Sequence, residues 1–210
     1  MIHFKDVFLF SKFTDIEWSI LYKHYTFKRY KKCLEIGSST VWKTENLSLY
    51  ADRVIGLELF PDRTPPNRNN VSYVTGDWQN LRTYVESASI DVAVACHVLE
   101  HVENDSDCIN QLYDVLETGS RAFVTTPNRA RLSRRIIEII TGPRVFPHWE
   151  HIREYDYEEI RTLIASSRFE KWSIIPAGVG LHAPWFHMYF HPVPHALRKF
   201  AAIWFVILEK

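Results

Sequence analysis

The sequence predicts an α/β fold: a mostly parallel seven-stranded sheet with helices on both faces and an antiparallel last strand. Apolar segments of strand length alternate with segments of helical periodicity along the chain. Residues 90–96 are apolar after Asp91, as in a strand that is covered on both faces. Residues 176–200 hold no crossover helix of the usual length. We therefore expect the final strand, 203–208, to run antiparallel at or near an edge.

Each element has a local signal. Thr14 and Glu17 form a capping box that opens a helix running to about Tyr30. Residues 61–70 are rich in proline and asparagine and are expected to be mostly loop. Strands are expected at 32–36, 53–58, 71–75, 90–96, 122–125, 172–175 and 203–208, and helices at 42–50, 80–87, 105–117, 131–140 and 156–167.

The size and charge of the chain limit its organisation and its partners. With 210 residues and 46% hydrophobic content, one domain is expected over residues 1–210. It would have a helical N-terminal segment at 1–30 and a cap insertion at 176–200. The formal net charge of +0 gives no general attraction to nucleic acids, so no nucleic-acid partner is expected.

A cytoplasmic location is expected. The first residues lack the pattern of a signal peptide, and the longest apolar run near the C-terminus, 200–208, is too short to cross a bilayer. An odd number of cysteines without CxxC spacing favours reduced, mostly buried thiols: Cys33, Cys96 and Cys108. Peripheral membrane contact through residues 181–208 stays an alternative.

Two predicted strands have an acid at or near their carboxyl end. Glu35 lies near the end of the first strand, shortly before Gly37, Ser38 and Ser39. Glu58 ends the second strand and is followed by Leu59. Strand, sharp turn, helix, strand and acid is the arrangement of a nucleotide-binding βαβ unit, whose second acid binds a ribose diol. The alternatives are a strand-to-helix turn with a capping serine and a solvated strand-end carboxylate.

Asp77 and Trp78 follow the third predicted strand. A carboxylate there could accept from the exocyclic amine of an adenine while the indole packs on the ring. The alternative is an N-cap aspartate beside a core tryptophan. His97 is the first polar residue after strand 90–96, at the edge where open α/β folds bind ligands. A structural role for His97 is the alternative.

Six blocks of this sequence resemble one family. In order they are CLEIGSSTV, VIGLELFPD, VTGDWQNL, IDVAVACHVLEHVEND, LYDVLETGSRAFVTTPN and HIREYDYEEIRTLIASSRFE. Together they resemble the class I S-adenosylmethionine-dependent methyltransferases, particularly small-molecule and quinone O-methyltransferases, over about residues 31–175. The resemblance implies a Rossmann-like fold, S-adenosylmethionine as cofactor and a small-molecule or lipid-linked acceptor, most often methylated at oxygen.

The resemblance also implies roles for individual residues. Glu35, Gly37 and their neighbours would hold the methionine half of the cofactor, and Glu58 the ribose hydroxyls. Asp77 and Trp78 would bind the adenine, and His97 would lie near the sulfonium.

The sequence departs from the family's glycine-rich pattern at Ser39 and Val41. A catalytically silent cofactor-binding scaffold is therefore the alternative function. A nicotinamide-dependent oxidoreductase is disfavoured, because only Gly37 remains of the expected G-x-G-x-x-G.

Histidines after residue 128 add candidate bases. His97, His148 and His151 could each remove a proton from the acceptor, since imidazole titrates near neutral pH. The spacing of His148 and His151 resembles a metal site only loosely, so no metal is expected. Four arginines could receive a substrate anion, or simply cover a solvated helix: Arg129, Arg131, Arg134 and Arg135.

The segment 178–200 combines histidines with aromatic residues. As a cap over the cleft it would suit an apolar or aromatic acceptor. A membrane contact and a dimer contact are the alternatives, and the oligomeric state is not determined by these patterns.

Overall fold

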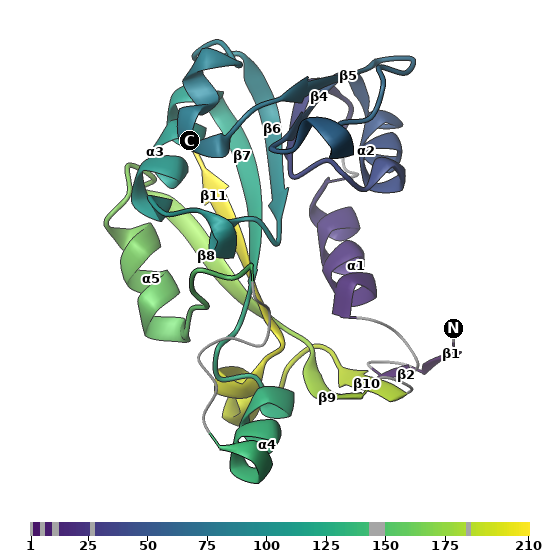
Figure 1. Ribbon diagram of the computed structural model, residues 1–210, viewed down its shortest axis with the longest axis vertical. Helices are drawn as coiled ribbons and strands as arrows, with labels where there is room; N and C mark the ends of the chain where they lie inside the picture. Colours follow the sequence, from purple (N-terminus) through teal and green to yellow (C-terminus); the bar gives the residue numbers. More distant parts are fainter. Residues whose placement is uncertain (1, 5–6, 10–12, 26–27, 143–149, 184–185) are drawn as a thin grey trace.

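The computed structural model describes residues 2–4, 7–9, 13–25, 28–142, 150–183 and 186–210. Its main sheet has the strand order β5-β4-β3-β6-β7-β11-β8, in which only β11 runs antiparallel (Figure 1). The predicted fold class is therefore confirmed. The strands are β3 (Tyr30–Ile36), β4 (Ala51–Glu58), β5 (Val71–Thr75), β6 (Ile90–Cys96), β7 (Leu116–Pro127), β8 (Lys171–Ala177) and β11 (Ile203–Glu209).

The last strand, β11, lies between β7 and the edge strand β8. The chain leaves β8 at its carboxyl end and reaches β11 without a crossover helix, so it re-enters the sheet from that end and must run antiparallel. The side chains from Ile203 to Leu208 are all buried. These residues belong to the sheet, so the membrane contact expected over 181–208 cannot include them.

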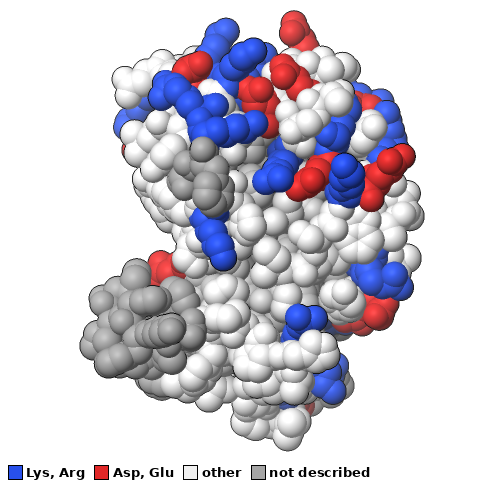
Figure 2. All heavy atoms as spheres, turned by 180° about the vertical axis from the view of Figure 1, so that it is seen from behind, with Lys and Arg blue, Asp and Glu red and all other residues white. Residues whose placement is uncertain are grey.

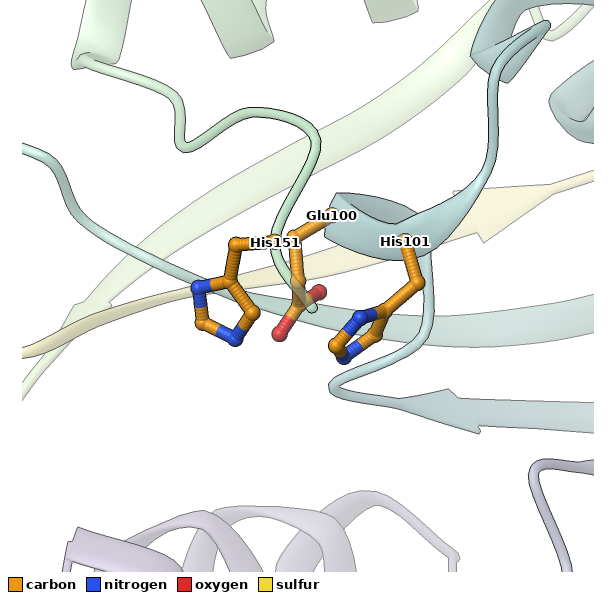
Figure 3. Close-up of side chains that lie close together, drawn as sticks. All are labelled: Glu100, His101 and His151. Atoms are coloured by element: carbon orange, nitrogen blue, oxygen red, sulfur yellow. The ribbon is translucent and has the colours of Figure 1, made fainter. Parts of the chain in front are cut away.

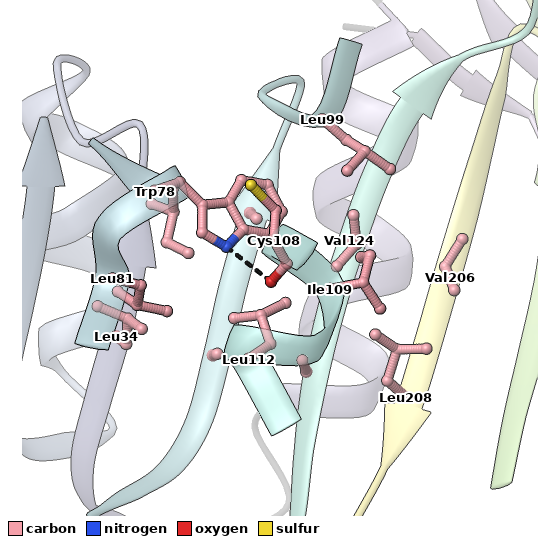
Figure 4. Packing of buried hydrophobic residues seen from close by; sticks show 14 of the residues in the cluster. Leu34, Trp78, Leu81, Leu99, Cys108, Ile109, Leu112, Val124, Val206 and Leu208 are labelled. Atoms are coloured by element: carbon pink, nitrogen blue, oxygen red, sulfur yellow. Dashed lines mark hydrogen bonds between the residues drawn. The ribbon is translucent and has the colours of Figure 1, made fainter. Parts of the chain in front are cut away.

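Helices cover both faces of the main sheet. On one face, α1 (Phe13–Tyr25) and α2 (Val41–Ser48) pack on β3, β4, β6, β7 and β11. On the other face lie the 3₁₀ helix η2 (Trp78–Thr83), α3 (Asp105–Val115) and α5 (Tyr157–Ala165). Figure 4 shows this second core, in which the Trp78 indole N–H donates to the Cys108 carbonyl at 3.1 Å.

A second, smaller sheet was not predicted. It has the order β1-β2-β10-β9, with β1 (Ile2–Phe4), β2 (Val7–Leu9), β9 (Val179–Ala183) and β10 (Phe186–Phe190). It lies beyond the carboxyl ends of the parallel strands, next to α4 (Leu132–Thr141) and the 3₁₀ helix η4 (His195–Phe200) (Figure 1). The N-terminal segment 1–30, expected to be helical, therefore contains β1 and β2 in addition to helix α1.

Several boundaries differ from the prediction. Helix α1 ends at Tyr25, because Tyr30 pairs with Ala51 in the sheet. The predicted helix 80–87 is the shorter η2, and β7 begins at Leu116. Two further 3₁₀ turns, η1 (Pro61–Arg63) and η3 (Leu99–His101), follow β4 and β6. Among the described residues, no helix has the length and hydropathy of a membrane span.

Candidate active site

Glu35 and Glu58 lie at the carboxyl ends of adjacent parallel strands. In the β3–β4 register Glu35 lies opposite Gly56, and both carboxylates are buried. The turn after β3 requires glycine, because Gly37 has φ +80° and a Cβ there would lie 2.6 Å from Cγ2 of Val98. The Gly37 N–H donates to the Leu57 carbonyl at 2.8 Å, which joins the two strand tips.

Polar and apolar groups surround these tips. Ser38 is buried, and its Oγ has no hydrogen-bond partner among the described residues. Ser39 is exposed. Glu58 Oε1 accepts from the Phe60 N–H at 3.3 Å, and the next side chain, Leu59, is 51% exposed. The tip of β4 therefore combines a carboxylate with open apolar surface.

Glu35 is buried without full compensation. Its Oε2 has no hydrogen-bond partner among the described residues. Burial raises the pKa of the Glu35 carboxyl to about 7, although Thr44 and Lys43 lower it in part, and the charge of Glu58 adds to the rise. A hydrogen-bond donor or a cation arriving at Glu35 would stabilise the ionised form.

Asp77 and Trp78 have structural roles. Asp77 is the N-cap of η2, and its Oδ1 accepts from the Gln79 N–H at 2.9 Å. The Trp78 ring is buried in the core on the α3 side of the sheet. This is the alternative arrangement considered for the pair, and their contact with adenine stays a prediction.

His97 lies between two buried acids. Its backbone has φ +57°, a conformation uncommon for a residue with a side chain. His97 Nδ1 lies 3.3 Å from Glu100 Oε1, and Nε2 lies 3.3 Å from Glu17 Oε1. Although burial alone would lower the pKa of His97, the charge of Glu17 and the contacts with Glu100 raise it to about 10. His97 is thus an imidazolium, which favours a positioning role over proton removal.

Glu17 is a site residue that the sequence analysis missed. The predicted capping box assigned it to the start of α1, but α1 begins at Phe13 and the Glu17 carboxylate is fully buried. It accepts a hydrogen bond from the Thr125 hydroxyl and contacts His97 instead. An acid on the sheet-facing side of an amphipathic helix is the signal that could have identified it.

A third group of side chains joins segments far apart in the chain. Glu100 and His101 belong to η3, and His151 precedes α5; one ligand-type atom from each lies within 4.8 Å of the other two (Figure 3). The Ile152 N–H donates to the Glu100 carbonyl at 3.0 Å, which fixes this arrangement. His148 lies outside the described residues.

The arginines near this group are ion-paired. Arg131 Nη1 lies 2.8 Å from Glu154 Oε2, and Arg134 also bonds Glu154. Arg129 pairs with Asp156 at 3.0 Å. These three arginines are therefore not favoured as a binding site for a substrate anion.

One open pocket lies elsewhere. It has a volume of about 520 Å³ and is lined by Arg129, Arg153 and residues of α5, away from the tips of β3 and β4. Arg153 bonds Asp105 at 2.7 Å. The convergence of buried polar groups is a better guide to the site than this pocket.

The three cysteines are free thiols. Burial raises the pKa of Cys33 and of Cys108 to about 12, and burial also raises that of Cys96. The expectation of unreactive, reduced thiols is consistent with these values.

Loss of the Glu17 carboxylate should destabilise the fold. Glu17→Ala removes one of the two acids that hold His97, and we expect the free energy of unfolding to fall by about 3–5 kcal/mol. Urea denaturation of this variant, with Glu86→Ala as an exposed-glutamate control, measures the change. In a double-mutant cycle, His97→Ala in the Glu17→Ala background should cost less than His97→Ala alone. Purely additive effects would contradict the pairing.

Glu35 should give the protein a measurable pH dependence. Its folded pKa of about 7 lies above the usual 4.5, so the folded state binds more protons than the unfolded state between these values. The free energy of unfolding should therefore fall as the pH rises from 5 to 7.5, by about 2–3 kcal/mol. Glu35→Gln should lose this component in urea denaturation at both pH values. If the free energy of unfolding of wild-type protein and of Glu35→Gln changed equally with pH, the raised pKa of Glu35 would be contradicted.

The chain was compared with known proteins. Residues 19–174 match the methyltransferase domain family, while a comparison with curated protein sequences gives no match. Solved structures with the same fold include the following three. An S-adenosylmethionine-dependent methyltransferase from Archaeoglobus fulgidus has 14% identity and a TM-score of 0.65, with 95% of each chain covered.

The second structure is an S-adenosylmethionine-dependent methyltransferase from Mesorhizobium loti. It has 14% identity and a TM-score of 0.65, with 93% of this chain and 98% of the Mesorhizobium chain covered. The third is a putative methyltransferase from Haloferax volcanii in complex with the Trm112 activator, with 10% identity and a TM-score of 0.67 over 93% and 90%. The family match extends from α1 to β8 and includes every residue of the strand tips described above. The chain belongs to the methyltransferase domain family.

Proposed function

We propose that this protein transfers the methyl group of S-adenosylmethionine to an oxygen atom of a small-molecule or lipid-linked acceptor. The observation that carries the cofactor part is the pair of buried carboxylates, Glu35 and Glu58, at neighbouring strand tips. Glu35 would meet the methionine amino group and Glu58 the ribose hydroxyls. The exposed Leu59 beside Glu58 suits an adenine face.

Further residues at the strand tips complete the proposed cofactor site. Ser38 and Ser39 follow the Gly37 turn and offer hydroxyl and backbone donors to the methionine carboxylate. Asp77 begins η2 beyond β5, and its carboxylate could accept from the adenine amine. Trp78 would then support this loop from the core.

The chemistry requires alignment more than activation. The sulfonium already activates the methyl carbon, so the protein must align the acceptor, exclude water and remove one proton. His97, His148 and His151 are the candidate bases. Of the two that the structure describes, His151 is better arranged for proton removal, because Glu154 Oε1 lies 3.0 Å from its Nδ1 and orients the ring.

The alternative is a silent cofactor-binding scaffold. Val41, at a position where the glycine-rich pattern has no side chain, is the first residue of α2 and half-buried. Calorimetry with S-adenosylmethionine, S-adenosylhomocysteine and NAD, followed by turnover with a panel of hydroxylated acceptors, tests the function. Binding of NAD alone would rule out the methyltransferase. Binding of the adenosyl ligands without any turnover would favour the scaffold.

Glu58→Ala should weaken the binding of the adenosyl ligand. Loss of charge-assisted hydrogen bonds to the ribose should cost about 1–3 kcal/mol in binding free energy. Calorimetry with S-adenosylhomocysteine measures the change, and Glu170→Ala provides an exposed-glutamate control. An unchanged dissociation constant for Glu58→Ala would remove this residue from the site.

We also propose that the end of the molecule formed by α4, β9 and η4 contacts a membrane, which would suit a lipid-linked acceptor. Ile139 and Ile140 of α4 are 84% and 77% exposed, and Arg198 and Lys199 on η4 are exposed cations. Figure 2 shows the molecule from behind: charged side chains gather in its upper half, and the described residues of its lower half are mostly uncharged. A dimer contact through the same surface is the alternative.

The membrane contact can be tested with vesicles. The double variant Ile139→Ser, Ile140→Ser should lower co-sedimentation with anionic vesicles at least about tenfold, because it removes two large apolar side chains from the interface. Leu49→Ser, which changes the exposed leucine directly after α2, is the matched control. Equal sedimentation of all three proteins would contradict the contact. A concentration-dependent change of mass without vesicle binding would instead support the dimer.

A further inference from the structure

Glu100, His101 and His151 form a cluster that the cofactor site does not use. Glu100 and His101 come from η3 after β6, whereas His151 lies fifty residues further along the chain. Figure 3 shows the three side chains converging, with one ring nitrogen of His151 turned toward Glu100. Their ligand-type atoms lie within 4.8 Å of one another. Ligands on a single tetrahedral ion lie about 3.4 Å apart, so small side-chain rotations would complete the geometry.

The Nδ1 atoms of both histidines make contacts of the kind that metal-binding histidines make with their non-binding nitrogen. His101 Nδ1 lies 3.0 Å from the Glu150 carbonyl oxygen, which can only accept, so Nδ1 carries the proton. His151 Nδ1 lies 3.0 Å from Glu154 Oε1, and Arg131 holds that carboxylate in turn. Such contacts fix the tautomer that presents Nε2 to a metal.

Glu100 supplies an independent observation. Its carboxylate is fully buried, and Oε2 has no hydrogen-bond partner among the described residues, whereas Oε1 contacts His97. A buried carboxylate oxygen without a donor is strongly unfavourable in a folded protein. A cation bound at Oε2 would remove this penalty.

We propose that Glu100, His101 and His151 bind one divalent transition-metal ion. Two imidazole nitrogens and one carboxylate oxygen suit Zn²⁺, Fe²⁺ or Co²⁺ better than Mg²⁺ or Ca²⁺, which prefer all-oxygen sites. Three protein ligands leave a coordination position open, as in catalytic rather than structural sites.

This inference rests on the proposed function and gives the metal a role in it. An acceptor hydroxyl bound at the open position would lose its proton to solvent more easily, because a metal ion lowers the pKa of a bound hydroxyl. The oxygen would then form its bond to the methyl carbon while the carbon–sulfur bond breaks and sulfur takes the electron pair. His151 would act as a ligand here, so metal binding replaces the need for a free base.

Co²⁺ titration of chelator-treated protein tests the site without any turnover. We expect visible absorption that saturates at one equivalent, competition by Zn²⁺ and no competition by excess Mg²⁺. His101→Gln, His151→Gln and Glu100→Gln should each bind Co²⁺ at least tenfold more weakly. His195→Gln, which changes an exposed histidine on η4, is the matched control and should bind normally.

A second measurement covers the case in which a variant fails to fold. In Co²⁺-loaded wild-type protein, two exchangeable imidazole N–H signals should be paramagnetically shifted, one from each Nδ1. Absence of a one-equivalent site, or equal affinity in folded histidine variants, would overturn the proposal. S-adenosylmethionine binding to the same metal-free protein is measured separately. Binding of S-adenosylmethionine without binding of Co²⁺ would contradict only the metal site. Binding of Co²⁺ without binding of S-adenosylmethionine would contradict only the proposed function.

Discussion

Five buried glutamates at the carboxyl end of the main sheet impose the constraint on which the rest of the site depends. They are Glu17, Glu35, Glu58, Glu100 and Glu154. Burial of a carboxylate is costly unless a cation or hydrogen-bond donors accompany it. Each of these acids must therefore be compensated by groups that the fold brings to it.

The compensation comes from segments far apart in the sequence. Helix α1 carries Glu17 to His97 and Thr125, and Glu154 is held by Arg131 and Arg134. Three acids are left with an oxygen that no described residue satisfies: Glu17, Glu35 and Glu100. Glu17 already contacts His97 and Thr125 through its other oxygen. We place ligands at the other two: the methionine amino group at Glu35 and a metal ion at Glu100.

The parts that could be predicted from the sequence are those with local signals. Strand segments β3 to β6, the Gly37 turn and the position of Glu58 all follow from apolar runs and the residues that end them. Strand β11 was predicted to be antiparallel because the segment before it has no crossover helix. The capping pattern at Glu17, by contrast, suggested a local role for a residue whose contacts, His97 and Thr125, are 80 and 108 positions away.

Long-range pairing explains the other omissions. The small sheet joins β2 to β10, separated by nearly the whole chain, and neither strand has a pronounced β-branched alternation. The meeting of His101 and His151 depends on backbone hydrogen bonds from the 151–153 segment to Glu100, which no spacing rule contains. Local patterns determine elements, whereas these contacts depend on how the elements pack.

Acids and cations also lie near one another across the site. Lys43 lies near enough to Glu35 and Glu17 to lower the pKa of each in part, and His97 lies between Glu17 and Glu100. A cation that binds at Glu35 would compete with Lys43 for that acid, and one that binds at Glu100 would compete with His97. A metal at Glu100 would loosen His97 from that side and strengthen its attachment to Glu17. If ligands bind at both proposed sites and alter each other's affinity through these groups, thermodynamic linkage requires the effect to be equal in both directions.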